Sequence, residues 1–152
     1  MGSFKFNGVD GITASFEQLA KLDDDTRWRI ISAGAEVVQR FQKAQIDLVF
    51  QRRTGQLFGS ITVKKKKSGE DMVAQIAPTG KRKRGSTGKR TYKGRSHGSY
   101  QGTNAEVAYI LEYGSPRIAA THWMETANEA AEPELMQAEA DAWDQHLRDL
   151  NL

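Results

Sequence analysis

The sequence contains no cysteine among its 152 residues. Disulfide bonds, zinc–thiolate sites and thiol catalysis are therefore excluded together. The absence is typical of proteins made in a reducing cytoplasm, where disulfides rarely form. We expect the fold to be held by packing and hydrogen bonds alone.

Histidines are few, and long apolar runs are missing. The three histidines, His97, His122 and His146, are too dispersed for a metal-binding motif, and Thr126 stands where a zinc helix starting at His122 requires a second histidine. No apolar run approaches membrane-spanning length. The first residues also lack the apolar core of a signal peptide. We expect no metal, no cofactor and no membrane partner.

Recognisable catalytic motifs are also missing. Residues 85–90 read Gly-Ser-Thr-Gly-Lys-Arg, without the glycine spacing or the Lys-Ser/Thr ending of a phosphate loop. No Gly-x-Ser-x-Gly elbow occurs. Glu112 is the one isolated acid in an apolar setting. It would be the catalytic carboxylate of an enzyme such as a hydrolase. We favour a structural carboxylate that bonds backbone or a basic neighbour, and we expect no enzyme.

The most distinctive segment present is 79–104, with eight Lys or Arg, six Gly and no carboxylate. It has too few apolar side chains to offset the entropy of ordering it. We predict one domain, 1–152, with 79–104 as a flexible basic insertion loop that orders against an outside partner. Its candidate contact residues are Lys81, Arg82, Lys83, Arg84, Lys89, Arg90, Lys93 and Arg95.

Charge is segregated along the chain, although the net charge is only +3. Residues 64–104 carry a net of +10, and residues 121–152 carry a net of −7. Nucleic acid is one partner that suits the loop, because cations neutralise phosphates and Tyr92 and Tyr100 can stack on bases. An acidic protein surface is another, including the C-terminal segment of a second copy in a head-to-tail contact. A solvated loop without a role is the third alternative.

Apolar residues at helical spacing predict a long helix over residues 26–50. The expected apolar face, with one polar member, is Trp28, Ile31, Ala35, Val38, Phe41, Gln45 and Leu48. The acids at 23–25 supply an N-cap and favourable charge for the helix dipole. Gly55 is expected to end this region as a left-handed stop.

The remaining elements are shorter. We predict a strand at 3–7, helices at 12–22 and 122–131, a turn at 57–60, and strands 61–67 and 72–77 joined by a hairpin at Ser68-Gly69. The lysines at 64–67 either protect the strand edge from aggregation or take part in binding. Residues 105–114 carry mixed helix and strand signals.

Pro133 is expected to begin a second C-terminal helix or to kink one. The apolar face of that last segment is Met136, Ala140, Trp143, Leu147 and Leu150, after Trp123, Ala127, Ala130 and Ala131 on the helix before it. Together the elements predict an α+β fold, in which a small, mostly antiparallel sheet packs on a long N-terminal helix. A C-terminal helical segment and the long basic loop complete it.

Two short patterns occur in order on either side of the basic loop. Thr54, Gly55, Leu57, Ser60 and Ile61 form the first, and Tyr109, Glu112, Tyr113 and Gly114 form the second, with Ala120 and Trp123 after them. In this order the chain resembles the tail-completion, or head–tail joining, proteins of long-tailed double-stranded DNA bacteriophages. The chain departs from the family at Phe58, where Arg is common, at Ser115, where Thr is common, and at 121–123, where Thr-His-Trp replaces Pro-Phe.

The resemblance implies a structural virion protein that forms a ring, commonly a hexamer, around the DNA channel in the neck. Its implied partners are other copies of itself, adjoining neck, tail-terminator or tail-tube proteins, and non-specific contact with genomic DNA. Its place would be the neck–tail junction of a virion assembled in the host cytoplasm. Thr54, Gly55 and Glu112 would set turns and packing. The alternative is a small basic nucleic-acid-binding protein that uses the 79–104 loop.

Overall fold

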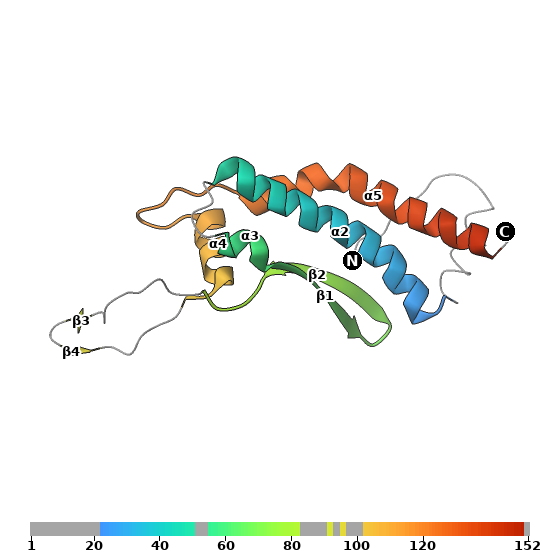
Figure 1. The fold of residues 1–152 in the computed structure, drawn as a ribbon, viewed down its shortest axis with the longest axis horizontal. Helices are drawn as coiled ribbons and strands as arrows, with labels where there is room; N and C mark the ends of the chain where they lie inside the picture. The colour runs from blue at the N-terminus through green and yellow to red at the C-terminus, as the bar shows by residue number, and fades with distance from the viewer. Residues whose placement is uncertain (1–21, 51–54, 83–90, 93–94, 97–101, 151–152) are drawn as a thin grey trace.

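The computed structural model describes residues 22–50, 55–82, 91–92, 95–96 and 102–150, and its fold is α+β as predicted (Figure 1). The elements are α2 (Asp24–Val49), α3 (Gln56–Ser60), β1 (Ile61–Ser68), β2 (Asp71–Pro78), β3 (Thr91–Tyr92), β4 (Arg95–Ser96), α4 (Asn104–Tyr113) and α5 (Trp123–Asp149). The strand predicted at 3–7 and most of the helix predicted at 12–22 lie outside the described residues. None of the described helices is both long and apolar enough to cross a membrane.

Helix α2 begins where the acidic cluster predicted it to begin. The N–H of Thr26 donates to the carboxylate of Asp23 at 2.7 Å, which makes Asp23 the N-cap. The predicted apolar face is partly wrong, because Leu48 is 80% exposed. Ala35 is buried as predicted, and the other buried positions of the helix are Thr26, Gly34, Val37, Gln42 and Ile46. The buried stripe is therefore broader than the predicted face and ends before Leu48.

Helices α2 and α5 lie side by side and antiparallel (Figure 1). Arg29 pairs with Asp149 at 3.6 Å at one end, and Gln42 donates to Asn128 at 2.9 Å towards the other. Of the two alternatives predicted for Pro133, the start of a second helix is wrong, because α5 runs through Pro133 as one helix of 27 residues, and the kink stays a prediction. Pro133 is exposed, and α5 packs along α2.

The prediction of an apolar face on the C-terminal segment also needs correction. Met136 and Leu150 are exposed and His146 is buried, although Ala127 and Ala131 are buried as predicted. Ala130 is exposed as well. The stripe that meets α2 thus includes a histidine that hydropathy alone assigns to the polar side.

Strands β1 and β2 form the predicted antiparallel hairpin, with Ile61 opposite Pro78 and Ser68 opposite Asp71. Successive side chains point to opposite faces of a strand. The ammonium group of Lys65 lies 5.4 Å from the ring of Trp28, and Lys67 pairs with Asp24, so both point towards α2. Lys64 and Lys66 occupy the other face and are exposed. Half of the lysine run is therefore used within the fold.

Gly55 has the predicted left-handed backbone (φ 65°) but not the predicted role. Helix α2 already ends at Val49, where Phe50 turns extended, and Gly55 instead precedes α3 as its N-cap. The mixed signals of 105–114 resolve as helix α4. A capping box between Thr103 and Glu106 starts that helix and satisfies its first N–H groups.

The core lies where α2, β1, α4 and α5 meet. Ile46, Ile61, Ala108 and Trp123 are its buried members, and Trp123 is completely buried. The ring of Phe50 packs edge-on against Trp123 with 6.4 Å between ring centroids. This core fixes the neighbouring turn between α4 and α5.

The basic insertion, for which we predicted no regular element, contains the short antiparallel pair β3–β4. Thr91 lies opposite Ser96, and Tyr92 lies opposite Arg95. In Figure 1 this pair stands apart from the helices, beyond α4.

Candidate functional site

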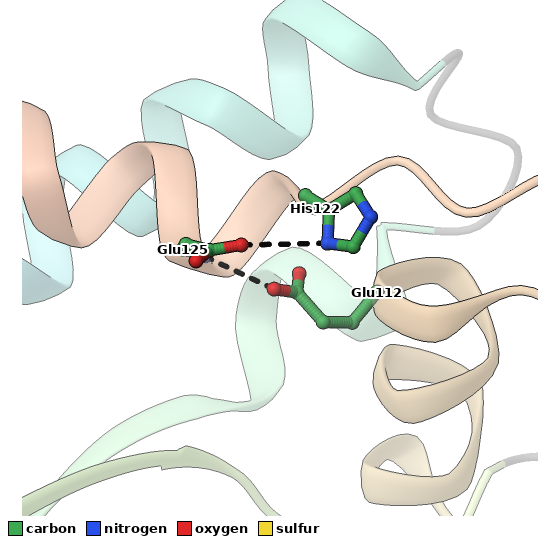
Figure 2. Close-up of side chains that lie close together, drawn as sticks. All are labelled: Glu112, His122 and Glu125. Atoms are coloured by element: carbon green, nitrogen blue, oxygen red, sulfur yellow. Dashed lines mark hydrogen bonds and ion pairs between the residues drawn. The ribbon is translucent and has the colours of Figure 1, made fainter.

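The turn between α4 and α5 brings three polar side chains together. Gly114 has a φ of 82°, and a Cβ there would lie 2.8 Å from the backbone nitrogen of Ala120, so only glycine fits. Beyond the turn, the N–H of His122 donates to the carbonyl of Glu112 at 3.2 Å. The result is the cluster Glu112, His122 and Glu125 (Figure 2).

Glu112 is buried, with 6% of its surface exposed, and its carboxylate is fully engaged. One oxygen accepts from the N–H of Met124 at 2.7 Å, and the other accepts from the N–H of Glu125 at 3.2 Å. His122, the residue at the N-cap position of α5, makes no capping bond with its own side chain. Glu112 therefore caps α5 from the end of α4, a backbone-bonded role of the kind we favoured from the sequence.

His122 has left-handed backbone (φ 48°), and its Nδ1 lies 3.4 Å from a carboxylate oxygen of Glu125. Glu112, His122 and Glu125 each offer one ligand atom, and these atoms lie within 4.8 Å of one another. A cation here would compete with both capping bonds of Glu112. It would also face the positive end of the α5 dipole. We assign the cluster to helix capping.

The residues of the first sequence pattern lie at the start of the sheet. The hydroxyl of Ser60 donates to the carbonyl of Leu57 at 2.7 Å, and the carbonyl of Ser60 accepts from the N–H of Thr79 at 2.9 Å. Ile61 enters the core beside Trp123. Thr54 lies outside the described residues. Ile61 of the first pattern and Trp123, which follows the second, therefore share one core, whereas Tyr109 of the second pattern is 64% exposed.

The basic segment leaves the fold and re-enters it at one place. Asn104 donates from its backbone N–H to the carbonyl of Gly80 at 3.1 Å and from its side chain to the carbonyl of Thr79 at 2.8 Å. The N–H of Arg82 donates to the carbonyl of Gly102 at 2.9 Å. Of the predicted contact residues, Lys81 and Arg82 thus lie at this stem and Arg95 lies in β4. Lys83, Arg84, Lys89, Arg90 and Lys93 lie outside the described residues.

An open groove runs beside the α4–α5 junction. Its first part, of about 580 Å³, lies between α4, α5 and the end of β2. The second part, of about 490 Å³, lies between α2, β2 and α5 and shares Met124, Asn128 and Glu129 with the first. We call the two parts together the α5 groove. Its apolar lining includes Ala77, Pro78, Ala108, Met124, Ile76, Val38 and Leu135.

Aromatic and acidic side chains border the α5 groove. The rings of Tyr109 and Tyr113 lie 4.8 Å apart on α4. Glu125, Glu129 and Glu132 line it from α5, and all three are exposed. Sequence reasoning missed this groove because its residues come from four separate elements. The acids were visible in the sequence only as part of the acidic C-terminal segment, without the apolar side chains that lie beside them.

Compared with known proteins, the chain matches no family model, no curated protein and no solved structure. Functional inference therefore rests on the residues and geometry of the chain itself.

Proposed function

We propose that this protein is a structural component of a tailed bacteriophage, a tail-completion or head–tail joining protein that forms a ring around the DNA channel in the neck. The observation that carries the proposal is that both patterns of the resemblance converge. Ile61 of the first pattern packs in the core with Trp123, and Glu112 of the second caps the helix that Trp123 begins. If a family shares these two patterns for packing and turns, their residues are expected to lie close together in the fold, as they do at the start of α5.

The chemistry of Glu112 supports a structural rather than an enzymatic role. Both carboxylate oxygens accept backbone hydrogen bonds, and the side chain is buried. A general base needs an oxygen within reach of the substrate proton. Proton abstraction by Glu112 would require breaking the cap of α5.

Self-assembly is supported by the apolar side chains that the single chain leaves exposed. Among the described residues these include Tyr109, Tyr113, Ile118 and Val73, each at least 45% exposed. Of these, Tyr109 and Tyr113 lie together, with 4.8 Å between ring centroids, and exposed aromatic side chains are enriched in protein interfaces. The partners proposed are other copies of the chain, commonly six in a ring, together with adjoining neck, tail-terminator or tail-tube proteins.

Native mass spectrometry and negative-stain imaging of the purified protein and of virions test this proposal. We expect a closed ring of one defined copy number and labelling of the virion neck. A strict monomer that is also absent from particles would contradict the proposal. Portal, capsid and tail-tube genes are expected beside the gene for this chain.

Nucleic-acid binding by the basic segment is the second candidate. The observation that favours it is the position of β3–β4, a pair that includes Arg95 and that lies apart from α2 and α5 (Figure 1). DNA binding measured across a salt series tests this second candidate. Binding that weakens steeply with salt supports the second candidate, because phosphate contacts release counterions. Absence of binding at low salt eliminates it.

A further inference from the structure

We propose that the α5 groove binds the cationic 79–104 segment of a second copy of this chain, so that copies join head to tail. The proposal deepens the proposed function and rests on its self-assembly, since it names the surface and the segment that meet. Four observations carry it: the lining of the groove, its charge, a buried acceptor without a partner, and the composition of the segment.

The lining of the groove is mostly apolar, which favours contact with a peptide over contact with water. Apolar side chains line most of it, and two large tyrosines at its border, Tyr109 and Tyr113, are 64% and 63% exposed. Aromatic side chains with this exposure are enriched where proteins bind one another. Their ring faces also attract Lys and Arg side chains through cation–π interactions.

The acidic side chains of the groove favour an occupant of positive charge. Glu125, Glu129 and Glu132 line it, and no described lysine or arginine does. Glu129 and Glu132 have no ion-pair partner within the described part of the chain. An acidic border repels phosphates, so nucleic acid is a poor occupant, whereas a cationic peptide is attracted.

A buried acceptor adds an independent reason. Gln42 is 2% exposed and lines the second part of the groove. Its side-chain nitrogen donates to Asn128, but its Oε1 is buried without a hydrogen-bond partner among the described residues. Buried oxygens left without a donor are costly. Lysine and arginine side chains carry only donors, so a basic peptide supplies the missing donor once the Gln42 amide turns towards the groove.

The chain itself contains one segment with the matching chemistry. Segment 79–104 carries eight cations and no acid, with Tyr92 and Tyr100 among them. Residues 1–21 are the longest other stretch outside the described residues, but Lys5 and Lys21 there balance Asp10 and Glu17. Residues 51–54 carry only two cations, Arg52 and Arg53. Charge therefore favours segment 79–104.

The occupant is assigned to a second copy because of where β3 and β4 lie. In Figure 1, this pair lies beyond α4 and away from α5. A groove on one copy and a segment of the next make a heterologous contact. Such contacts generate closed rings when the rotation between copies allows.

Cross-linking tests the contact directly, and the absence of native cysteine makes the chemistry clean. The variant Arg95→Cys/Glu129→Cys is treated with a short bis-maleimide and separated under denaturing conditions. We expect a ladder of covalent dimers and larger species. The matched control is Arg95→Cys/Asp144→Cys, whose second position is exposed on α5 outside the groove. Equal ladders in both variants, or a link confined within single chains, would overturn the proposal.

Charge reversal tests the energetics in the intact protein. Glu129→Lys/Glu132→Lys is expected to weaken self-association by about tenfold or more, measured as the concentration dependence of mass. Asp141→Lys/Asp144→Lys reverses the same number of charges on the same helix and is expected to assemble like the wild type.

The outcomes separate this inference from the proposed function. A wild-type ring that survives Glu129→Lys/Glu132→Lys unchanged overturns the groove contact and leaves the neck role standing. A wild-type protein that stays monomeric and is absent from virions overturns both.

Discussion

The carboxylate of Glu112 belongs to the last turn of α4, yet it accepts hydrogen bonds from the first turn of α5. The usual capping residue comes just before the helix, where its short side chain reaches back to the N–H groups. Here His122 fills that position with left-handed backbone, and its ring turns to Glu125 instead. One buried carboxylate thus ties two helices together.

Replacing Glu112 is predicted to destabilise the fold. Glu112→Ala leaves the N–H groups of Met124 and Glu125 without their acceptor, which costs about 1–3 kcal/mol of unfolding free energy. Glu112→Gln keeps one acceptor oxygen and is expected to lose less. Urea denaturation measures both variants, with Glu129→Ala as an exposed control. A Glu112→Ala midpoint equal to that of the wild type would contradict the capping role.

Burial against α2 raises the pKa of the Glu139 carboxyl above its ordinary value of 4.5. A carboxyl with a raised folded-state pKa favours folding while it is protonated, and that contribution is lost as pH rises through the raised pKa. Glu139→Gln is therefore predicted to raise the Tm at pH 7. At about pH 3.5, where the wild-type group is mostly protonated, the two proteins should melt alike. Asp141→Asn is the control, and thermal melts at both pH values are the measurement. A difference in Tm that is the same at both values would contradict the prediction.

At the scale of elements, α2 and α5 approach closely where Gly34 faces Glu139. A Cβ on Gly34 would lie 2.6 Å from the Oε1 of Glu139 and 2.9 Å from its Cγ. Alanine favours a helix over glycine by about 1 kcal/mol, but here that gain meets a clash.

A double-mutant cycle tests this close approach. Gly34→Ala alone is predicted to lower the unfolding free energy by roughly 1 kcal/mol, because overpacking outweighs helix propensity. In the Glu139→Ala background the same change is predicted to stabilise by about 1 kcal/mol. Chemical denaturation of the four proteins gives the coupling. Effects that add within about 0.5 kcal/mol would show that the two residues do not interact.

The sequence predicted those elements whose signals are local. Asp23 and the apolar spacing predicted α2, and Ser68-Gly69 predicted the hairpin. Prediction from the sequence failed where tertiary packing decides which side chains are buried. Leu48, for example, has the spacing of the apolar face but is exposed to solvent. Pro133 is a strong local signal that a long contact with α2 overrides.

The candidate site divides in the same way. A backbone-bonded role for Glu112 was expected, because an isolated acid among apolar residues needs donors nearby. The α5 groove was not predictable, since Gln42, Ile76, Tyr109 and Glu129 come together only through the tertiary fold. Its acids look like any solvated helix face until their neighbours are known.

At the scale of the whole molecule, the two described ends of the basic segment meet at one place on the helical body. Lys81 pairs with Thr103, and Asn104 bonds to both Thr79 and Gly80. The described helices and hairpin are therefore expected to fold without the Lys and Arg residues between 83 and 95.

Removal of the segment is predicted to spare the fold. Replacing residues 83–101 with a short Gly-Ser linker should keep the helical circular-dichroism signal and shift the Tm by only about 2 °C, a fraction of 1 kcal/mol. Self-association should be lost. A second variant of native length, with Ser at each Lys and Arg of 83–95, separates length from charge. Unfolding of the linker variant would contradict the prediction that the helices and the hairpin fold without residues 83–101.

A segment whose two ends are hydrogen-bonded to each other can change in length without moving the helices behind it. The cost is small, because loop-closure entropy grows only slowly with length. Insertions and deletions among related sequences should consequently concentrate between Arg82 and Gly102, whose backbones are hydrogen-bonded to each other. New recognition properties can then be acquired there while the rest of the molecule stays as it is.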